Sequence, residues 1–234
     1  MQSSLLIAVL KKHQQQFHSV VLFDHSKDKL WPFDLTIANT EIPNDIFSDT
    51  PKFTHWVNKK LTDSNARYGI GGYAEHRTVY SISRVFDAAK PGEEPRRLHL
   101  GTDIWGKPHT PVMAPLDGIV HSFAFNNHFG DYGVTIILSH ILEGISFYTL
   151  YGHLGLSSIK NMQEGDRIEK GDIFSEFGIA AENGSWPPHL HFQIIEDIKD
   201  WKGDFPGVCK YSEKEKYLNN SPDPDWILQL NQYL

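Results

Sequence analysis

Two histidines stand two residues apart in the segment 185–194, SWPPHLHFQI. An apolar run follows them, so the segment is predicted to open a strand, and side chains at i and i+2 of a strand lie on the same face. His189 and His191 are therefore expected to point together, with Leu190 and Phe192 on the other face. Such imidazoles can bind a metal or transfer protons, and either role needs partners elsewhere in the chain.

Other side chains in the same part of the sequence can supply those partners. In LHLGTD, His99 and Asp103 stand four residues apart. Gly101 between them disfavours a helix, and in an extended segment residues at i and i+4 also share a face. His153, in LYGHLGL, ends a predicted strand just before a turn, where side chains commonly reach a cleft.

The combination of these side chains favours a catalytic metal centre, although each signal is weak by itself. A catalytic zinc typically has three protein ligands and one open position. His99, Asp103 and either His189 or His191 would supply the three ligands. His153 and the other histidine of the pair would remain free to transfer protons to and from a zinc-activated water.

The elements that would hold these side chains are short strands, which predicts a mainly β fold. The segments are rich in β-branched and aromatic residues, and Gly, Pro, Asn and Asp separate them. Because no long helical period lies between them, an antiparallel sheet is expected, and not a doubly wound parallel one. The predicted strands lie in TVYSISRVF, PVMAPLDGIVHSFAF, YGVTIILSH, GISFYTLYGHL, DRIEKGDIFSEFG and HLHFQII.

Helices are predicted at both ends of the chain. Thr50, before Pro51, is expected to cap the second of them. We expect an N-terminal helical and loop extension at 1–78, the β core at 79–200, and a C-terminal extension at 201–234 that ends in a helix. The residues at helical spacing are Leu6, Val9, Leu10 and Phe17, then Phe53, Trp56, Val57 and Leu61, and finally Trp226, Ile227, Leu230 and Leu234. The glycines of YGIGGYAEHRTVY lack the spacing of a phosphate loop and predict a tight turn or a close backbone approach.

Composition excludes several classes of protein. Lys and Arg number 22 against 29 Asp and Glu, a net charge of −7, whereas a nucleic-acid partner needs a basic face. Cys209 is the single cysteine, so an internal disulfide and a zinc ribbon are impossible. No apolar run approaches the roughly 20 residues needed to cross a membrane. The N-terminal apolar stretch is too short for a signal peptide, which predicts a cytoplasmic protein without a membrane partner.

The region from about residue 96 to 196 resembles the lysostaphin-type (LytM-like, duplicated hybrid motif) zinc metallopeptidases. HLGTDIWGKPHTPVMAPLDGIV, YGVTIILSH, FYTLYGHL, EGDRIEKGDIFSEFG and PPHLHFQI carry the resemblance, in the family's order. It implies a compact core of antiparallel sheets with a groove between loops. It also implies one zinc ion held by His99, Asp103 and His191, with His153 and His189 as the catalytic pair. Members typically cut peptide bonds in bacterial cell-wall cross-links, often beside glycine.

Three departures from the family pattern bear on the site. His109 stands where glycine is commoner, and it is expected at the surface, with a place near the metal as the alternative. Trp186 and the prolines after it are expected to narrow one wall of the groove. Gln193 replaces a frequent acidic residue, which alters contacts around the ligands but removes none.

The sequence indicates the substrate and the partners less clearly than it indicates the site residues. A looser similarity, in GIGGYAEHRTVY, WPPHLHFQ, DFPGV and PDPDWIL, is to modules joined to aminotransferase-containing bacterial chains, and it suggests a functional link to such enzymes. The leading hypothesis is a zinc endopeptidase acting on wall-type or glycine-containing peptides. The alternative is a catalytically inactive metal-binding or peptide-binding module on the same scaffold. We also expect part of residues 1–75, around Asn39 or Asn65, to lie over the groove and restrict large substrates.

Overall fold

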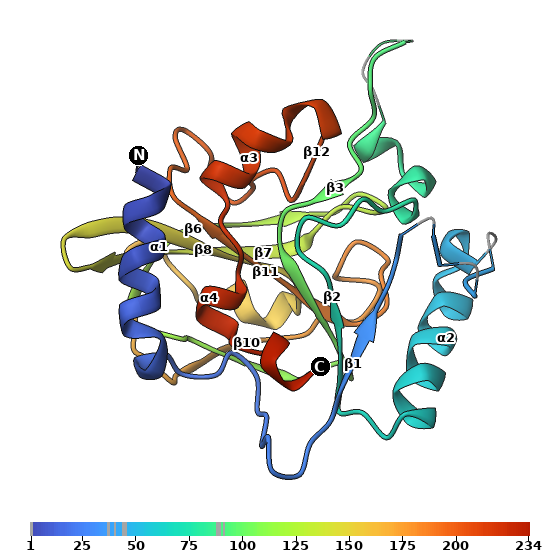
Figure 1. Ribbon diagram of the computed structural model, residues 1–234, viewed down its shortest axis with the longest axis horizontal. Coiled ribbons are helices and arrows are strands. Elements are labelled where there is room, and N and C mark those ends of the chain that lie inside the picture. The colour runs from blue at the N-terminus through green and yellow to red at the C-terminus, as the bar shows by residue number, and fades with distance from the viewer. Residues whose placement is uncertain (1, 37, 40, 44–45, 88–89, 91) are drawn as a thin grey trace.

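The computed structural model describes residues 2–36, 38–39, 41–43, 46–87, 90 and 92–234. Its main feature is a large, mostly antiparallel sheet, in the strand order β1-β2-β4-β11-β8-β7-β6-β9 (Figure 1). Two small two-stranded sheets, β10-β5 and β12-β3, accompany it. The predicted mainly β class with an antiparallel core is confirmed.

The strands β1, β2 and β4 at one edge of the main sheet are short, whereas β6, β7 and β8 are long. Their bounds are β1 Leu30–Phe33, β2 Tyr68–Gly71, β3 Leu98–His99, β4 Thr102–Trp105, β5 Pro111–Met113, β6 Gly118–Asn126, β7 Gly133–Leu142, β8 Ile145–Leu154, β9 Arg167–Ile168, β10 Ile173–Glu176, β11 His189–Ile195 and β12 Val208–Cys209.

The centre of the sheet is β11, which lies between β4 and β8 and is buried along its whole length. A strand buried on both faces is expected to be apolar throughout, so its polar residues, His189, His191 and Gln193, must be paired inside the protein. The neighbouring β7–β8 hairpin closes through Glu143 and Gly144, whose φ angles of 51° and 78° suit a tight two-residue turn. The rigid centre of the sheet thus carries the residues predicted to do chemistry.

Helices cover opposite sides of the molecule (Figure 1). The bounds are α1 Gln2–His13, α2 Thr50–Asp63, α3 Lys214–Asn220 and α4 Asp225–Leu228. Leu6 and Leu10 of α1 are buried in the main core, which also contains Ile227 and Leu228 of α4. The apolar face of α2 packs in a second cluster with Trp105 and Trp186. Among the described residues, no helix combines the length and apolarity needed to cross a membrane.

Two local predictions were wrong. The segment TVYSISRVF is not a strand but two 3₁₀ helices, Val79–Ile82 and Arg84–Phe86. Its hydroxyl residues favour local turns over a strand ladder, since Ser83 Oγ accepts the Val85 amide at 3.2 Å. The cap of α2 is Asp49, whose carboxylate accepts the Lys52 amide at 3.0 Å, and not Thr50. Thr50 instead donates its hydroxyl to the carbonyl of Ser185, at 2.7 Å.

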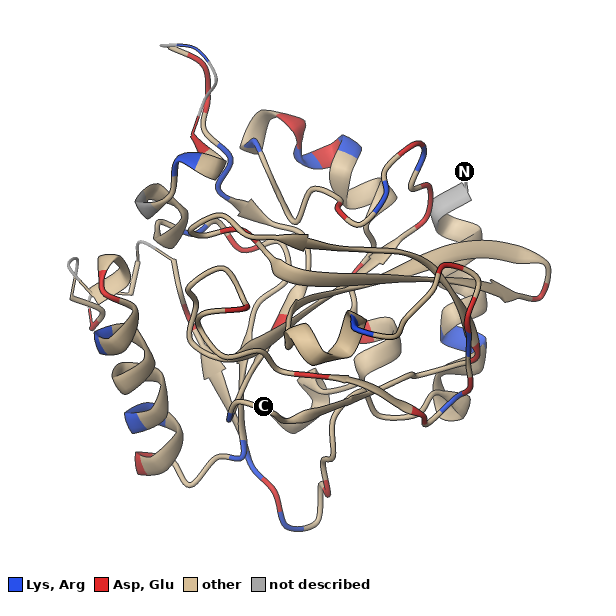
Figure 2. Cartoon of the chain, turned by 180° about the vertical axis from the view of Figure 1, so that it is seen from behind, with Lys and Arg blue, Asp and Glu red and all other residues tan. Residues whose placement is uncertain are grey.

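The two terminal segments contain more than the sequence predicts. The N-terminal segment has the expected helices and also contributes β1 and β2 to the main sheet. The expected C-terminal helix is only the single turn of α4, because Gln229 adopts a left-handed φ of 51° and ends it. Helix α3 was not predicted. Figure 2 shows acidic and basic residues next to one another on α2 and α3, so these helices carry mixed charge.

Candidate metal centre and active site

Four strands bring the five predicted site residues together. His189 and His191 come from β11, Asp103 from β4, His153 from β8 and His99 from β3. In the β11–β4 ladder His191 lies opposite Asp103, so the two side chains share a face of the sheet. His191 faces Gly152 on the β8 side, and the ring of Tyr132 occupies the space that a side chain at Gly152 would fill.

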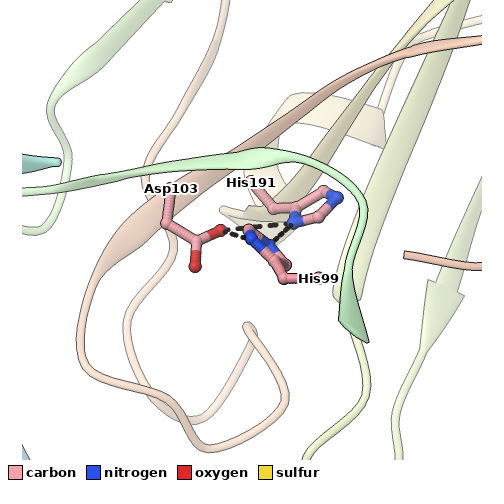
Figure 3. Close-up of side chains that lie close together, drawn as sticks. All are labelled: His99, Asp103 and His191. Carbon is pink, nitrogen blue, oxygen red and sulfur yellow. Dashed lines mark hydrogen bonds and ion pairs between the residues drawn. The ribbon is translucent and has the colours of Figure 1, made fainter. Parts of the chain in front are cut away.

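His99, Asp103 and His191 form a compact cluster (Figure 3). His99 Nε2 lies 2.9 Å from His191 Nδ1, and Asp103 Oδ1 lies 3.2 Å from each of these nitrogens. All three side chains are nearly inaccessible, at 1% to 3% exposure. No other group of three or more His, Cys, Asp or Glu within the described residues has this potential metal-binding arrangement.

Hydrogen bonds on the far side of each ring determine which nitrogen faces the centre. His99 Nδ1 donates to the carbonyl of Gly72 at 2.9 Å, so its Nε2 carries the lone pair. The amide nitrogen of Gln193 donates to the carbonyl of Pro206, which turns its oxygen toward His191 Nε2, 3.1 Å away. His191 Nε2 therefore carries the ring proton, and its Nδ1 carries the lone pair. Two imidazole lone pairs and a carboxylate oxygen thus converge with no proton between them.

This donor set fits zinc. At Zn–N and Zn–O distances near 2.0–2.1 Å, tetrahedral ligand atoms lie about 3.3 Å apart, close to the 2.9–3.2 Å separations here. Three acceptor atoms held together in a buried site repel one another unless a cation lies between them. Outer hydrogen bonds to ligating histidines are typical of zinc sites.

The other two histidines lie beside the cluster with their rings close together. The ring centroids of His153 and His189 are 4.1 Å apart, and His189 Nε2 lies 4.0 Å from Asp103 Oδ1. Both Nδ1 atoms donate to backbone carbonyls, of Asn183 for His153 and of Pro187 for His189. Each ring therefore keeps a free lone pair at Nε2. The left-handed φ of 66° at His153 interrupts the alternation of β8 next to the site, the kind of strained backbone that recurs at functional sites.

Burial shifts the pKa values of the histidines and of the carboxylate at this site. It lowers the pKa of His99 and of His189 to about 4. Burial also lowers the pKa of His153 well below 6.5, and the neighbouring His189 and His191 lower it further. Burial alone would raise the pKa of Asp103, but His99 and Arg77 offset it and hold that pKa well below 3.8. At neutral pH these three imidazoles are neutral bases and Asp103 is a carboxylate.

A cavity of about 120 Å³ opens onto these histidines. Its walls include Leu35 and Phe53 of the N-terminal segment. The segment therefore lines part of the cavity, although neither Asn39 nor Asn65 belongs to the described lining, and its restriction of large substrates stays a prediction. Trp186 does form part of the wall, as predicted. His109 is a surface residue, 60% exposed and 3.2 Å from the carboxylate of Glu176.

Residues 97–202 match Peptidase family M23. We call this matched region, which is a little under half of the chain, the M23 domain. Peptidases of this family are zinc-dependent and act on peptidoglycan. The M23 domain contains all five predicted site residues.

Two curated proteins resemble the chain over this region. The L-Ala–D-Glu endopeptidase of Bacillus subtilis is 29% identical over 141 residues, which are 56% of this chain and 41% of that protein. A metalloprotease described as uncharacterized, from Haemophilus influenzae, is 34% identical over 99 residues, 42% of this chain and 18% of that protein. The aligned regions therefore span less than half of either relative.

Among solved structures, the chain is similar to the catalytic domain of lysostaphin from Staphylococcus simulans. The alignment covers 70% of this chain and 97% of that domain, with 23% identity and a TM-score of 0.38.

Three residues around the M23 site were not found by sequence reasoning. Arg77 lies outside the matched region and bonds Asp103. The hydroxyl of Tyr132 lies 3.4 Å from His191 Nε2, and burial raises its pKa well above 10, so it stays protonated. Trp105 stacks on His189, with ring centroids 4.0 Å apart and 15° between the planes. Only its place opposite His189 in the β4–β11 ladder identifies Trp105, and that pairing requires the fold.

Proposed function

We propose that this protein is a zinc-dependent metalloendopeptidase that hydrolyses peptide bonds in peptidoglycan-type or glycine-containing peptides. The observation that carries the proposal is the convergence of three unprotonated ligand atoms, His99 Nε2, Asp103 Oδ1 and His191 Nδ1, beside two further neutral imidazoles. The name of the Bacillus relative suggests the L-Ala–D-Glu bond as one candidate substrate bond. The cytoplasmic location and the link to aminotransferase-type enzymes stay predictions.

The residues of the site divide the work between holding the ion and moving protons. Zinc held by His99, Asp103 and His191 supplies a Lewis acid that activates water and polarises the scissile carbonyl. His153 and His189 each offer a free Nε2, and their lowered pKa keeps them neutral at pH 7, the state that a general base requires. One Nε2 would accept the proton of the attacking water, and the same imidazole, now protonated, would donate that proton to the leaving amine.

The first prediction separates ligands from catalysts. His99→Ala, Asp103→Ala and His191→Ala are each expected to lose stoichiometric zinc, because two remaining ligands hold a catalytic ion poorly. His153→Ala and His189→Ala are expected to retain zinc and lose turnover by about 10²–10⁴-fold. Elemental analysis and amine release from a panel of L-Ala–D-Glu and glycine-containing peptides measure the two effects.

The exposed His109→Gln is the matched control and should change neither quantity. Full zinc content in two of the three ligand variants would overturn the metal assignment. Zinc lost from His189→Ala but kept by His191→Ala would exchange the roles of that pair. A wild-type protein that binds one zinc but releases no amine from any peptide would point to the inactive binding module.

A further inference from the structure

The groups that orient two of the proposed ligands come from outside the M23 domain. The domain begins at residue 97, whereas the carbonyl of Gly72 accepts the Nδ1 proton of His99 and the guanidinium of Arg77 bonds Asp103. These contacts lie directly behind the atoms proposed to bind zinc. Histidine and carboxylate ligands usually need such outer hydrogen bonds to fix their orientation.

Arg77 is held on several sides at once. It is 1% exposed. Its Nε donates to Glu75 Oε2 at 2.5 Å, and its Nη1 donates to Asp103 Oδ2 at 2.5 Å and to the Tyr80 hydroxyl at 3.2 Å. Its Nη2 donates to the carbonyl of Gly72 at 3.3 Å. A planar guanidinium with five donors can make all these contacts together, whereas a lysine ammonium cannot.

The surrounding backbone leaves a space for this side chain. A Cβ at Gly71 would lie 2.8 Å from Arg77 Nη2, so a glycine is needed where Arg77 passes β2. The charge is balanced within the same group, because Glu75 lies against Nε while Asp103 lies against Nη1. The cation beside the proposed metal site is therefore compensated by two carboxylates, and a buried charge that is paired in this way can persist.

The contact divides the two oxygens of Asp103. Oδ2 is occupied by Arg77, while Oδ1 faces His99 Nε2 and His191 Nδ1 at 3.2 Å. A carboxylate with one oxygen engaged offers only the other to a metal. Two imidazoles and one oxygen then give three protein ligands and leave one position open, as a catalytic zinc requires.

We propose that Arg77 is a positioning residue that holds Asp103 Oδ2 so that Oδ1 alone is presented to the metal ion. The inference rests on the proposed zinc site. Without Arg77 both oxygens of Asp103 are free, so the carboxylate loses its orientation and can bind through two oxygens. The metal site is then weaker, and its coordination number is higher.

The test uses the full-length protein loaded with Co²⁺, whose visible absorption weakens as coordination rises from four to five. Arg77→Gln is expected to lower the affinity for Zn²⁺ and Co²⁺ by about 10–100-fold and to weaken the cobalt band several-fold. Arg77→Lys keeps the positive charge but loses the planar guanidinium with its several donors. It is therefore expected to lower the metal affinity and to weaken the cobalt band, as Arg77→Gln does. Arg67→Gln, which breaks an exposed ion pair with Asp28, is the matched control.

The outcomes separate this inference from the proposed function. Stoichiometric metal in the wild-type protein tests the site itself, whereas the variants are compared only with that wild-type protein. If Arg77→Gln fails to fold, Arg77→Lys decides. A folded Arg77 variant with affinity within about twofold of wild type and an unchanged cobalt band would overturn the positioning role, whatever its effect on thermal stability.

Discussion

Gly101 determines how closely His191 can approach the other proposed ligands. A Cβ at this position would lie 2.5 Å from His191 Cε1 and 2.8 Å from the carbonyl oxygen of Phe192. Because the second contact is with backbone, a side chain at residue 101 could be accommodated only by moving the imidazole or the strand. The glycine is thus needed for the geometry of the proposed metal site and not only for a turn.

Gly101→Ala is therefore expected to reduce zinc affinity without removing any ligand, by about 10–100-fold, similar to the loss of an outer contact. Isothermal titration with Zn²⁺ measures it. Ile173→Ala is the control, since Ile173 is 65% exposed and does not line the cavity at the proposed site. Equal zinc affinity in Gly101→Ala and wild type would contradict this account of the site.

The spacing of His99 and Asp103 predicts their proximity, but the reason differs from the predicted one. They do not share the face of a single extended strand. His99 belongs to β3, which pairs with β12, and Asp103 belongs to β4 in the main sheet. The chain passes from one sheet to the other between them, so the two side chains converge across a junction. Residue spacing cannot reveal which sheet each half of a motif joins.

At the scale of elements, the 3₁₀ helices Val79–Ile82 and Arg84–Phe86 form a wall of the cavity at the proposed active site. Val79, Tyr80, Val85 and Phe86 all line it. Phe86 packs on Tyr80 with ring centroids 4.7 Å apart, and Tyr80 lies 6.3 Å from the His99 ring. The proposed catalytic histidines are only 3% to 7% exposed beneath this wall. A long peptide must therefore displace part of it.

Phe86→Ala is expected to favour long substrates selectively. Removing the ring loosens the packing of Tyr80 and widens the cavity, so kcat/KM should rise several-fold more for a long peptide than for a short one with the same scissile bond. Ile173→Ala, at a 65% exposed position outside the cavity, is the control. Since a buried Phe→Ala substitution costs about 3–5 kcal/mol, thermal melting must accompany the kinetics. Equal changes for both peptides in a folded variant would contradict the covering role.

At the scale of the whole molecule, the sequence predicts the β core far better than the segment before it. The strands β6, β7, β8 and β11 have long runs of β-branched and aromatic residues, which alone identify them. By contrast, β2 reads YGIG, and its glycines are explained only by tertiary neighbours. A Cβ at Gly69 would lie 2.0 Å from the ring of Phe33, a contact that no local pattern encodes. The predicted close backbone approach was correct, but the strand was missed.

These two strands make the N-terminal segment part of the folded sheet. In the β2–β4 ladder Gly71 lies opposite Asp103, and Ile70 opposite Ile104. Leu30, Phe33 and Ile70 are buried, at 3% to 8% exposure. A chain that begins after β2 would therefore expose β4, the strand that carries Asp103.

Removing residues 1–78 is accordingly expected to destabilise the protein instead of simply opening the groove. Leu30, Phe33 and Ile70 each contribute about 2 kcal/mol by burial, and their loss alone corresponds to a fall in Tm of about 10–20 °C. The fragment 79–234 also lacks Arg77. We therefore expect it to lose both its bound zinc and its cooperative melting transition. Deletion of residues 232–234, which include the exposed Tyr233 and Leu234, is the control and should leave melting and zinc content unchanged. A fragment 79–234 that melts cooperatively within a few degrees of the full chain, with one zinc bound, would mean that β4 holds the site without β2.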